Sequence, residues 1–147
     1  MTSARIAAVC LLALGVASAA DARSTTHRLK IADVLKSDEY KEKVGTAVAF
    51  YFDSQGAPQV AENFGEFATR KTTRSMIEKD EDACQRAMIS ALVSLRERAE
   101  KQGGNAVIHV TTYRKKTSTG SATEYECRAG DLVAHVDLKG TVVRLTK

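Results

Sequence analysis

Residues 80–102 read DEDACQRAMISALVSLRERAEKQ, and this stretch decides the fold. Three carboxylates open it, where acidic side chains favour the positive end of a helix dipole. Gly103 and Gly104 follow it, and glycine commonly ends helices. The pattern predicts one long helix with an alanine-rich apolar face suited to close packing on a sheet. The side chains of that face recur at i, i+3, i+4 and i+7 spacing, and they are Cys84, Ala87, Met88, Ala91, Leu92, Leu95 and Ala99.

Strands are expected on the C-terminal side of this helix. In residues 132–138, LVAHVDL, apolar and polar side chains alternate, which is typical of a half-buried strand. The set expected to face the helix is Leu132, Ala134, Val136 and Leu138. The opposite set is Val133, His135 and Asp137. Further strands are predicted at 106–114, 124–127 and 141–145, with a loop at 115–123 and turns at 128–130 and 139–140.

The N-terminal side predicts a hairpin over residues 46–64. TAVAFYF at 46–52 is rich in β-branched and aromatic residues, as strands are. The cluster DSQGAP at 53–58 is typical of a turn, and 59–64 is the expected returning strand. Residues 65–79 are polar, and we expect a solvated loop there. This loop carries a basic cluster, which consists of Arg70, Lys71 and Arg74, and phosphate binding there is the alternative.

The order of these elements predicts an α+β domain over residues 46–147. A hairpin, one main helix and three to four further strands are most simply arranged as a mostly antiparallel sheet with the helix on one face. Residues 20–45 are predicted to be a flexible leader with a short helical turn that Ser37 caps. His27 lies in this leader and is expected to have no specific role.

Residues 1–19 read as a cleavable signal peptide. Arg5 precedes an apolar run over 6–16, and Ala-Ser-Ala at 17–19 is the small-residue pattern that signal peptidase accepts, with cuts after Ala20 or Ala22 as alternatives. The run is too short for a membrane span, which needs about 20 apolar residues. A lipoprotein cut before Cys10 is disfavoured by the branched residue that precedes it. We therefore expect a periplasmic or secreted protein without stable membrane insertion after cleavage.

Two cysteines, Cys84 and Cys127, remain after signal cleavage. In an exported domain such a pair most often forms a disulfide; the alternative is two free buried thiols. The bridge would close a loop of about 43 residues and stabilise the domain by roughly 4 kcal/mol in the chain-entropy model. Because Cys84 lies in the first turn of the predicted helix and Cys127 at a strand end, it would fasten the helix start to the sheet.

Residues 87–107 follow the pattern A-x-x-x-A-L-x-x-L-x-x-x-A-x-x-x-G-G-N-A-V, and Tyr-Glu-Cys at 125–127 and the strand at 132–138 come after it. With these features the chain resembles a group of uncharacterised secreted proteobacterial proteins, some of which carry the name "excinuclease ATPase subunit". Residues 84–138 resemble, more distantly, the sensor lipoprotein of the Rcs envelope-stress phosphorelay and the YbjQ-like βαββ family. The Rcs sensor has a helix-to-strand disulfide that Cys84 and Cys127 match in placement.

Departures from these families limit what the resemblance implies. The Rcs sensor has a second disulfide and a lipid anchor, whereas this chain has two cysteines after cleavage and no convincing lipobox. Signalling through that phosphorelay is therefore not expected. An excinuclease ATPase needs a G-x-x-x-x-G-K-[ST] loop or paired C-x-x-C zinc units, and the sequence contains neither. The nuclease name is rejected on this chemistry.

The opposite sheet face is the one candidate for a metal site. If Ala106, Ile108 and Val110 face the helix, then His109 shares the other face with His135 and Asp137. Two imidazoles and a carboxylate suit zinc or copper, and the face could also include Glu124 and Glu126. The alternative is a wet face of ordinary polar residues.

Catalysis is not expected. Ser90 and Ser94 lie mid-helix, without the base and orienting group that a nucleophile needs, and the two cysteines are expected to be oxidised. The net charge of +4 is too small to argue for a polyanion, so nucleic acid is not the expected partner. The sequence favours a non-catalytic binding or envelope-sensing domain with no cofactor and an envelope protein as partner. A metal or small-ligand binder and an unrecognised hydrolase are the alternatives, and the oligomeric state is left open.

Overall fold

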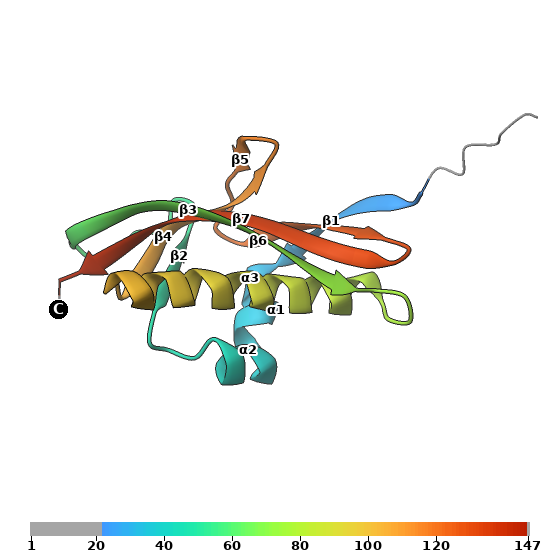
Figure 1. Ribbon diagram of the computed structural model, residues 1–147, viewed down its shortest axis with the longest axis horizontal. Helices are drawn as coiled ribbons and strands as arrows, with labels where there is room; N and C mark the ends of the chain where they lie inside the picture. Colours follow the sequence, from blue (N-terminus) through green and yellow to red (C-terminus); the bar gives the residue numbers. More distant parts are fainter. Residues whose placement is uncertain (1–21, 147) are drawn as a thin grey trace, which may run out of the picture.

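The computed structural model describes residues 22–146, so the predicted signal peptide and Cys10 lie outside the described residues. Within this range one sheet of seven strands is covered on one face by the main helix, α3 (Asp80–Gln102), as Figure 1 shows. Two short helices lie on the same side as α3. The fold is therefore α+β, as predicted. The other elements are β1 (Ser24–Lys30), α1 (Ile31–Lys36), α2 (Asp38–Lys43), β2 (Ala49–Phe52), β3 (Val60–Arg74), β4 (Ala106–Arg114), β5 (Thr117–Thr119), β6 (Glu124–Gly130) and β7 (Val133–Leu145).

Strand β7 is the centre of the sheet. Antiparallel β3 runs along one side of it, from Val60 opposite Leu145 to Arg74 opposite Val133. On its other side β7 pairs with β6 near its start and with β4 nearer its end, again antiparallel. Beyond these, β1 extends the sheet from β6, β2 pairs with β4 in parallel, and β5 pairs with the end of β4. The described sheet thus has β1, β2, β3 and the short β5 at its borders.

Helix α3 has the predicted bounds. Gly103 takes a left-handed conformation (φ 81°) that ends the helix, as glycine does without steric cost. The face that meets the sheet is closed to solvent, and it packs against Ala134, Val136 and Leu138 of β7, each at most 1% exposed. The buried residues of the helix are Ala83, Cys84, Ala87, Met88, Ile89, Ala91, Leu92, Leu95 and Ala99.

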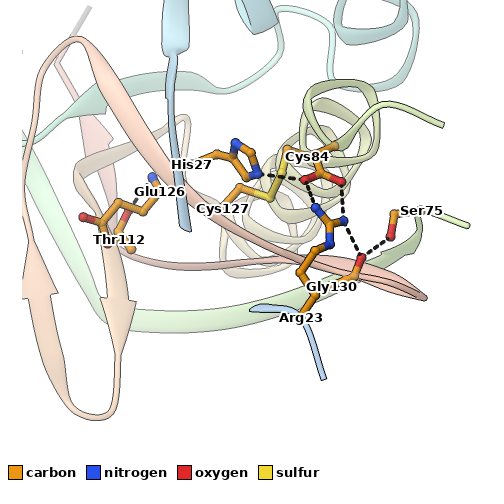
Figure 2. The surroundings of a disulfide bond; sticks show 9 residues. Arg23, His27, Ser75, Cys84, Thr112, Glu126, Cys127 and Gly130 are labelled. Carbon is orange, nitrogen blue, oxygen red and sulfur yellow. Dashed lines mark hydrogen bonds and ion pairs between the residues drawn. A yellow bond between two sulfur atoms is a disulfide. The ribbon is translucent and has the colours of Figure 1, made fainter. Parts of the chain in front are cut away.

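The disulfide joins the first turn of α3 to β6, as predicted. Cys84 and Cys127 are bonded with their Cα atoms 5.7 Å apart, and both are fully buried. Figure 2 shows the bridge crossing from the helix to the strand. The bond therefore closes the core at the helix start and links two elements 43 residues apart in sequence.

The prediction of a flexible leader was wrong for residues 22–45. These residues form β1, which pairs with β6 over its whole length, and the helices α1 and α2. Strand β1 has no buried residue, so it carries no apolar alternation that would reveal it. Helix α1 buries only Ile31 and Val34. The expected cap is present, because the Ser37 hydroxyl accepts a hydrogen bond from the Tyr40 amide.

The predicted hairpin over 46–64 was also wrong. Strand β2 pairs in parallel with β4, and β3 pairs with β7, so the two strands do not meet. Nor is the stretch 65–79 a loop throughout, because β3 continues to Arg74. This strand lies at the border of the sheet with one face open, and none of its residues is fully buried. Its polar composition therefore resembles that of a loop.

Strand boundaries in the C-terminal half differ from the prediction in three places. Strand β6 continues through the expected turn at 128–130, and the expected loop at 115–123 contains β5. Strand β7 runs unbroken through the expected turn at 139–140. Gly140 is needed there for space, because a Cβ atom would lie 2.5 Å from Val107 Cγ1. Leu132, predicted to face the helix, is instead 62% exposed in the turn before β7.

A bulge at His109 overturns the predicted faces of β4. The pairing with β7 shifts between Ile108 and Thr111, and His109 takes a left-handed conformation (φ 52°). Such a bulge adds one residue and reverses the alternation beyond it. Val107 and Val110 consequently both belong to the main core, whereas Ala106 and Ile108 pack in a second, smaller cluster.

Candidate functional site

The face of the sheet opposite α3 has no covering layer in the described part of the chain (Figure 1). Strand alternation sends the core residues of β6 and β7 toward the helix and their polar neighbours outward. Arg128 of β6 lies directly opposite His135 of β7, and Thr72 of β3 lies opposite His135 on the other side. Two residues further along, Asp137 lies opposite Arg70. We call this surface the open face.

His135 lies where β4 and β6 both adjoin β7. Its Nε2 atom is buried and has no hydrogen-bond partner within the described residues. The same holds for Arg128 Nε on β6 and Thr111 Oγ1 on β4. Buried polar atoms are nearly always satisfied in folded proteins, so three such atoms on adjacent strands mark an unusual site. Hydrogen-bonding capacity is therefore unmet among these buried atoms.

The environment of His135 is electropositive. Burial lowers the pKa of its imidazole first, and the positive charges of Arg70, Arg128 and Arg114 lower it further. The carboxylate of Asp137 acts in the opposite direction. Since an ordinary histidine titrates near 6.5, this imidazole is neutral at neutral pH. Arg70, Arg128 and Arg114 belong to β3, β6 and β4, and each lowers the pKa of an imidazole on β7.

Asp137 holds one of these cations in place. The Arg70 guanidinium donates from Nε to Asp137 Oδ1 at 2.5 Å and from Nη2 to Oδ2 at 3.3 Å. The Asp137 side chain is only 13% exposed, whereas that of Arg70 is 61% exposed. Asp137 therefore positions the arginine without covering it.

A hollow of about 290 Å³ opens beside this ion pair. The β4–β5 extension rises above the open face (Figure 1) and supplies part of its wall. The hollow contains three cationic side chains and one carboxylate, so its charge is net positive. Its lining residues are Ala68, Thr69, Arg70, Tyr113, Arg114, Lys115 and Asp137.

The predicted metal ligands do not gather into one site. His109 lies in the β4 bulge, exposed, with its Nδ1 atom 3.1 Å from the Asp53 carbonyl oxygen. Asp137 is held by Arg70, and Glu126 of β6 is paired with Arg28 at 3.0 Å. Within residues 22–146 no group of three or more His, Cys, Asp or Glu side chains is placed to hold a metal ion. The bulge is the physical reason that the assumed face of β4 was wrong.

The serines considered as nucleophiles lie apart from any acid–base pair among the described contacts. Ser90 is exposed on α3, and the Ser94 hydroxyl accepts a hydrogen bond from Thr69 Oγ1 at 3.3 Å. Both cysteines are joined in the disulfide.

A second polar cluster lies beside the disulfide. Asp80, the first residue of α3, accepts two hydrogen bonds from the Arg23 guanidinium and lies 2.9 Å from His27 Nε2 (Figure 2). The hydrogen bond from Arg23 is the main cause that lowers the pKa of Asp80; burial opposes it, and His27 assists. The expectation that His27 has no specific role was wrong, because it joins β1 to the helix start.

Of Arg70, Arg114 and Arg128, the sequence singles out only Arg70, as part of the basic cluster. The sequence predicts a loop at Arg70 and a turn at Arg128, and it does not predict which strands pair with the one that ends at Arg114. The only usable signal was the alternation at 124–130, where charged residues at 124, 126 and 128 mark one exposed face. Which strands lie next to one another could not be derived from it.

No protein-family model, no curated protein and no solved structure matches this chain. Among the described residues, no helix combines the length and the apolar character needed to cross a membrane.

Proposed function

We propose that this protein is a non-catalytic binding domain of the periplasm or the extracellular space, and that it holds an acidic segment of an envelope protein on the open face. The observation that carries the proposal is the register that sets Arg128 opposite His135 and Arg70 opposite Asp137, beside a positively charged hollow that Arg70 and Arg114 line. Carboxylates are the groups that such a surface would recognise.

The arginines suit carboxylate recognition by their geometry. A guanidinium presents planar, paired donors that match both oxygens of a carboxylate. Arg70 is oriented by Asp137 and keeps most of its surface exposed. Arg128 donates from Nη2 to Ser24 Oγ, whereas its Nε has no partner within the described residues. The accessible donors of the face are therefore those of Arg70, since Arg128 Nε is buried.

The compartment in this proposal rests on two supports. Residues 1–19 have the character of a signal peptide. The disulfide between Cys84 and Cys127 suits an oxidising compartment, where such bonds persist. The absence of catalysis is supported by the serines and cysteines, which are engaged structurally or lie away from a base.

A titration of the isotope-labelled, oxidised protein with hexaglutamate tests the binding, with NMR amide shifts as the readout. We expect saturable shifts concentrated at Arg114, Arg128 and His135, which weaken as salt is raised because the pairs are partly exposed. The variant R114Q/R128Q should lose at least about tenfold in affinity, or roughly 1.4 kcal/mol. Pyrophosphate in a parallel titration distinguishes a general anion site from one for carboxylate chains.

The matched control is K36Q/K101Q. It removes the same charge from exposed lysines of α1 and α3, on the helix side of the sheet. This variant should bind hexaglutamate as the wild type does. Equal losses in both double variants, or the absence of saturable shifts at millimolar peptide, would overturn the proposal.

A further inference from the structure

Strand β3 is a long, unpartnered border of the sheet. It has 15 residues and pairs with β7 on one side. In the described part of the chain no strand pairs with its other side. Such a border presents a row of free N–H and C=O groups that can accept a further strand.

The border is also physically accessible. A hollow of about 480 Å³ lies beside the second half of the strand, next to α2 and α3. Glu66, Ala68 and Arg70 are exposed, and Figure 1 shows β3 running along β7. The hollow is lined by Lys43, Lys71, Thr72, Ser90 and Val93.

The charges of β3 are divided between its two halves. Glu62 and Glu66 lie in the first half, whereas Arg70, Lys71 and Arg74 lie in the second. Antiparallel pairing of β3 with a second copy places the acidic half of each strand beside the basic half of the other. The strand is therefore complementary to itself in the antiparallel direction.

One register uses this complementarity directly. If the two-fold axis passes through Ala68, Glu66 of each copy lies opposite Arg70 of the other. The two side chains are on the same face and are 63% and 61% exposed. Centring the pair on residue 66 or 70 would instead place like charges opposite each other, which destabilises a sheet.

Glu66 and Arg70 each form an ion pair with a residue of β7 in their own chain. Lys139 Nζ lies 3.3 Å from Glu66 Oε1, and Asp137 holds Arg70. In the paired copies the four charges would alternate in sign, from Lys139 through Glu66 to Arg70 and Asp137 of the second copy. Ala68, at the axis, is exposed and small, so the two strands can approach there.

We propose that β3 is the interface through which two copies of this chain join their sheets into one continuous sheet. Regular pairing of β3 begins at Gly65, because its register with β7 shifts between Asn63 and Gly65. With the axis at Ala68, Gly65 lies opposite Lys71 of the second copy, so the pairing covers about residues 65–71. A ladder this short gives a dimer that dissociates on dilution. The proposal shares Arg70 with the acidic-segment site, whereas Arg114 and Arg128 of that site lie on β4 and β6, outside the paired strand.

Sedimentation velocity of the oxidised, mature protein over a concentration series tests this pairing with two charge reversals. The wild type should dimerise as concentration rises. E66R places two arginines opposite each other and R70E places two glutamates, so each variant alone should be mainly monomeric. An equimolar mixture of the two restores both opposite-charge pairs and should form a heterodimer. Because a misfolded variant could not form this heterodimer, the rescue shows that each variant alone is monomeric through lost pairing and not through lost folding.

The control is E124R, a reversal of the same kind on β6, on the far side of β7 from β3. It should dimerise as the wild type does. A wild type that stays monomeric at millimolar concentration would overturn the proposal. So would variants that dimerise normally alone, or a mixture that remains monomeric.

Discussion

His27 on β1 lies directly opposite Cys127 on β6, and its Nε2 atom lies 2.9 Å from Oδ2 of Asp80. The covalent bond to Cys84 and the polar contacts to Asp80 therefore fasten the same end of α3 to two adjacent strands (Figure 2). The disulfide joins α3 to β6, and the contacts of Asp80 join the same end of α3 to β1. Removing one should have a different effect from removing the other.

Removing the disulfide should lower global stability. The bond closes a loop of 43 residues, and the chain-entropy model assigns such a loop about 4 kcal/mol. The variant C84A/C127A should therefore unfold at a much lower urea concentration than the oxidised wild type. Its urea m-value should be larger, because the unfolded chain is no longer crosslinked and exposes more surface.

Wild-type protein with and without reducing agent provides the companion measurement. Reduction should lower its melting temperature, and intact-mass analysis of protein purified from the exported fraction should find no free thiol. Complete alkylation without prior reduction would contradict the bridge. Equal urea midpoints for oxidised and reduced protein would contradict its energetic role.

Replacing Asp80 should act locally. D80N removes the charge that Arg23 and His27 contact, so β1 should open more often while the helix and core stay intact. Hydrogen exchange of β1 amides should become several-fold faster, with little change in the amides of β7. D82N is the control, since Asp82 lies in the same helical turn and is exposed. Uniform acceleration in all strands would show that Asp80 supports the whole fold instead.

The helix and the disulfide could be predicted from the sequence because their signals are local. The spacing of small apolar residues from Cys84 to Ala99 identifies one helix face without any knowledge of its partner. The alternation from Ala134 to Leu138 likewise identifies the buried side of one strand. The pairing of Cys84 with Cys127 needed no geometry, since two cysteines allow one bridge.

The border strands could not be predicted because their stability comes from neighbours. Strand β1 and strand β3 bury no residue fully, and each is held by its backbone ladder to a distant segment. The bulge at His109 is a second obstacle, because it reverses the faces of β4 with no local composition signal. The open-face site depends on all three features, which explains why its arginines were missed and why His109 was wrongly included.

The pKa of His135 should lie below 6.5, and two substitutions should move it in opposite directions. R128Q removes a positive charge opposite the imidazole and should raise the pKa, whereas D137N removes a negative charge and should lower it. The pH dependence of the imidazole NMR signals measures both. Shifts in the same direction for the two variants would contradict the electrostatic description of the open face.

The lowered pKa of His135 also predicts how the stability of the fold depends on pH. The folded pKa of His135 is lower than the unfolded one, so the unfolded state binds the proton more tightly. The contribution of this residue is complete above about pH 6.5, the ordinary histidine value, and is lost as the pH falls through the folded pKa. The urea midpoint of the wild type should therefore fall over this window more than that of H135N. Parallel pH profiles for the two proteins would refute the linkage.

A methyl group at Gly140 should destabilise the sheet. A Cβ atom there would lie 2.5 Å from Val107 Cγ1 and 3.3 Å from Val110 Cγ2, and both valines are closed in the core. Overpacking of this kind typically costs about 1–3 kcal/mol, so G140A should unfold at a lower urea concentration. G56A is the matched control, because a Cβ at Gly56 meets no atom within 4 Å. It should stay within about 0.5 kcal/mol of the wild type. Equal midpoints for the two variants would mean that β4 can move away from β7 without loss, and that the strands do not require glycine here.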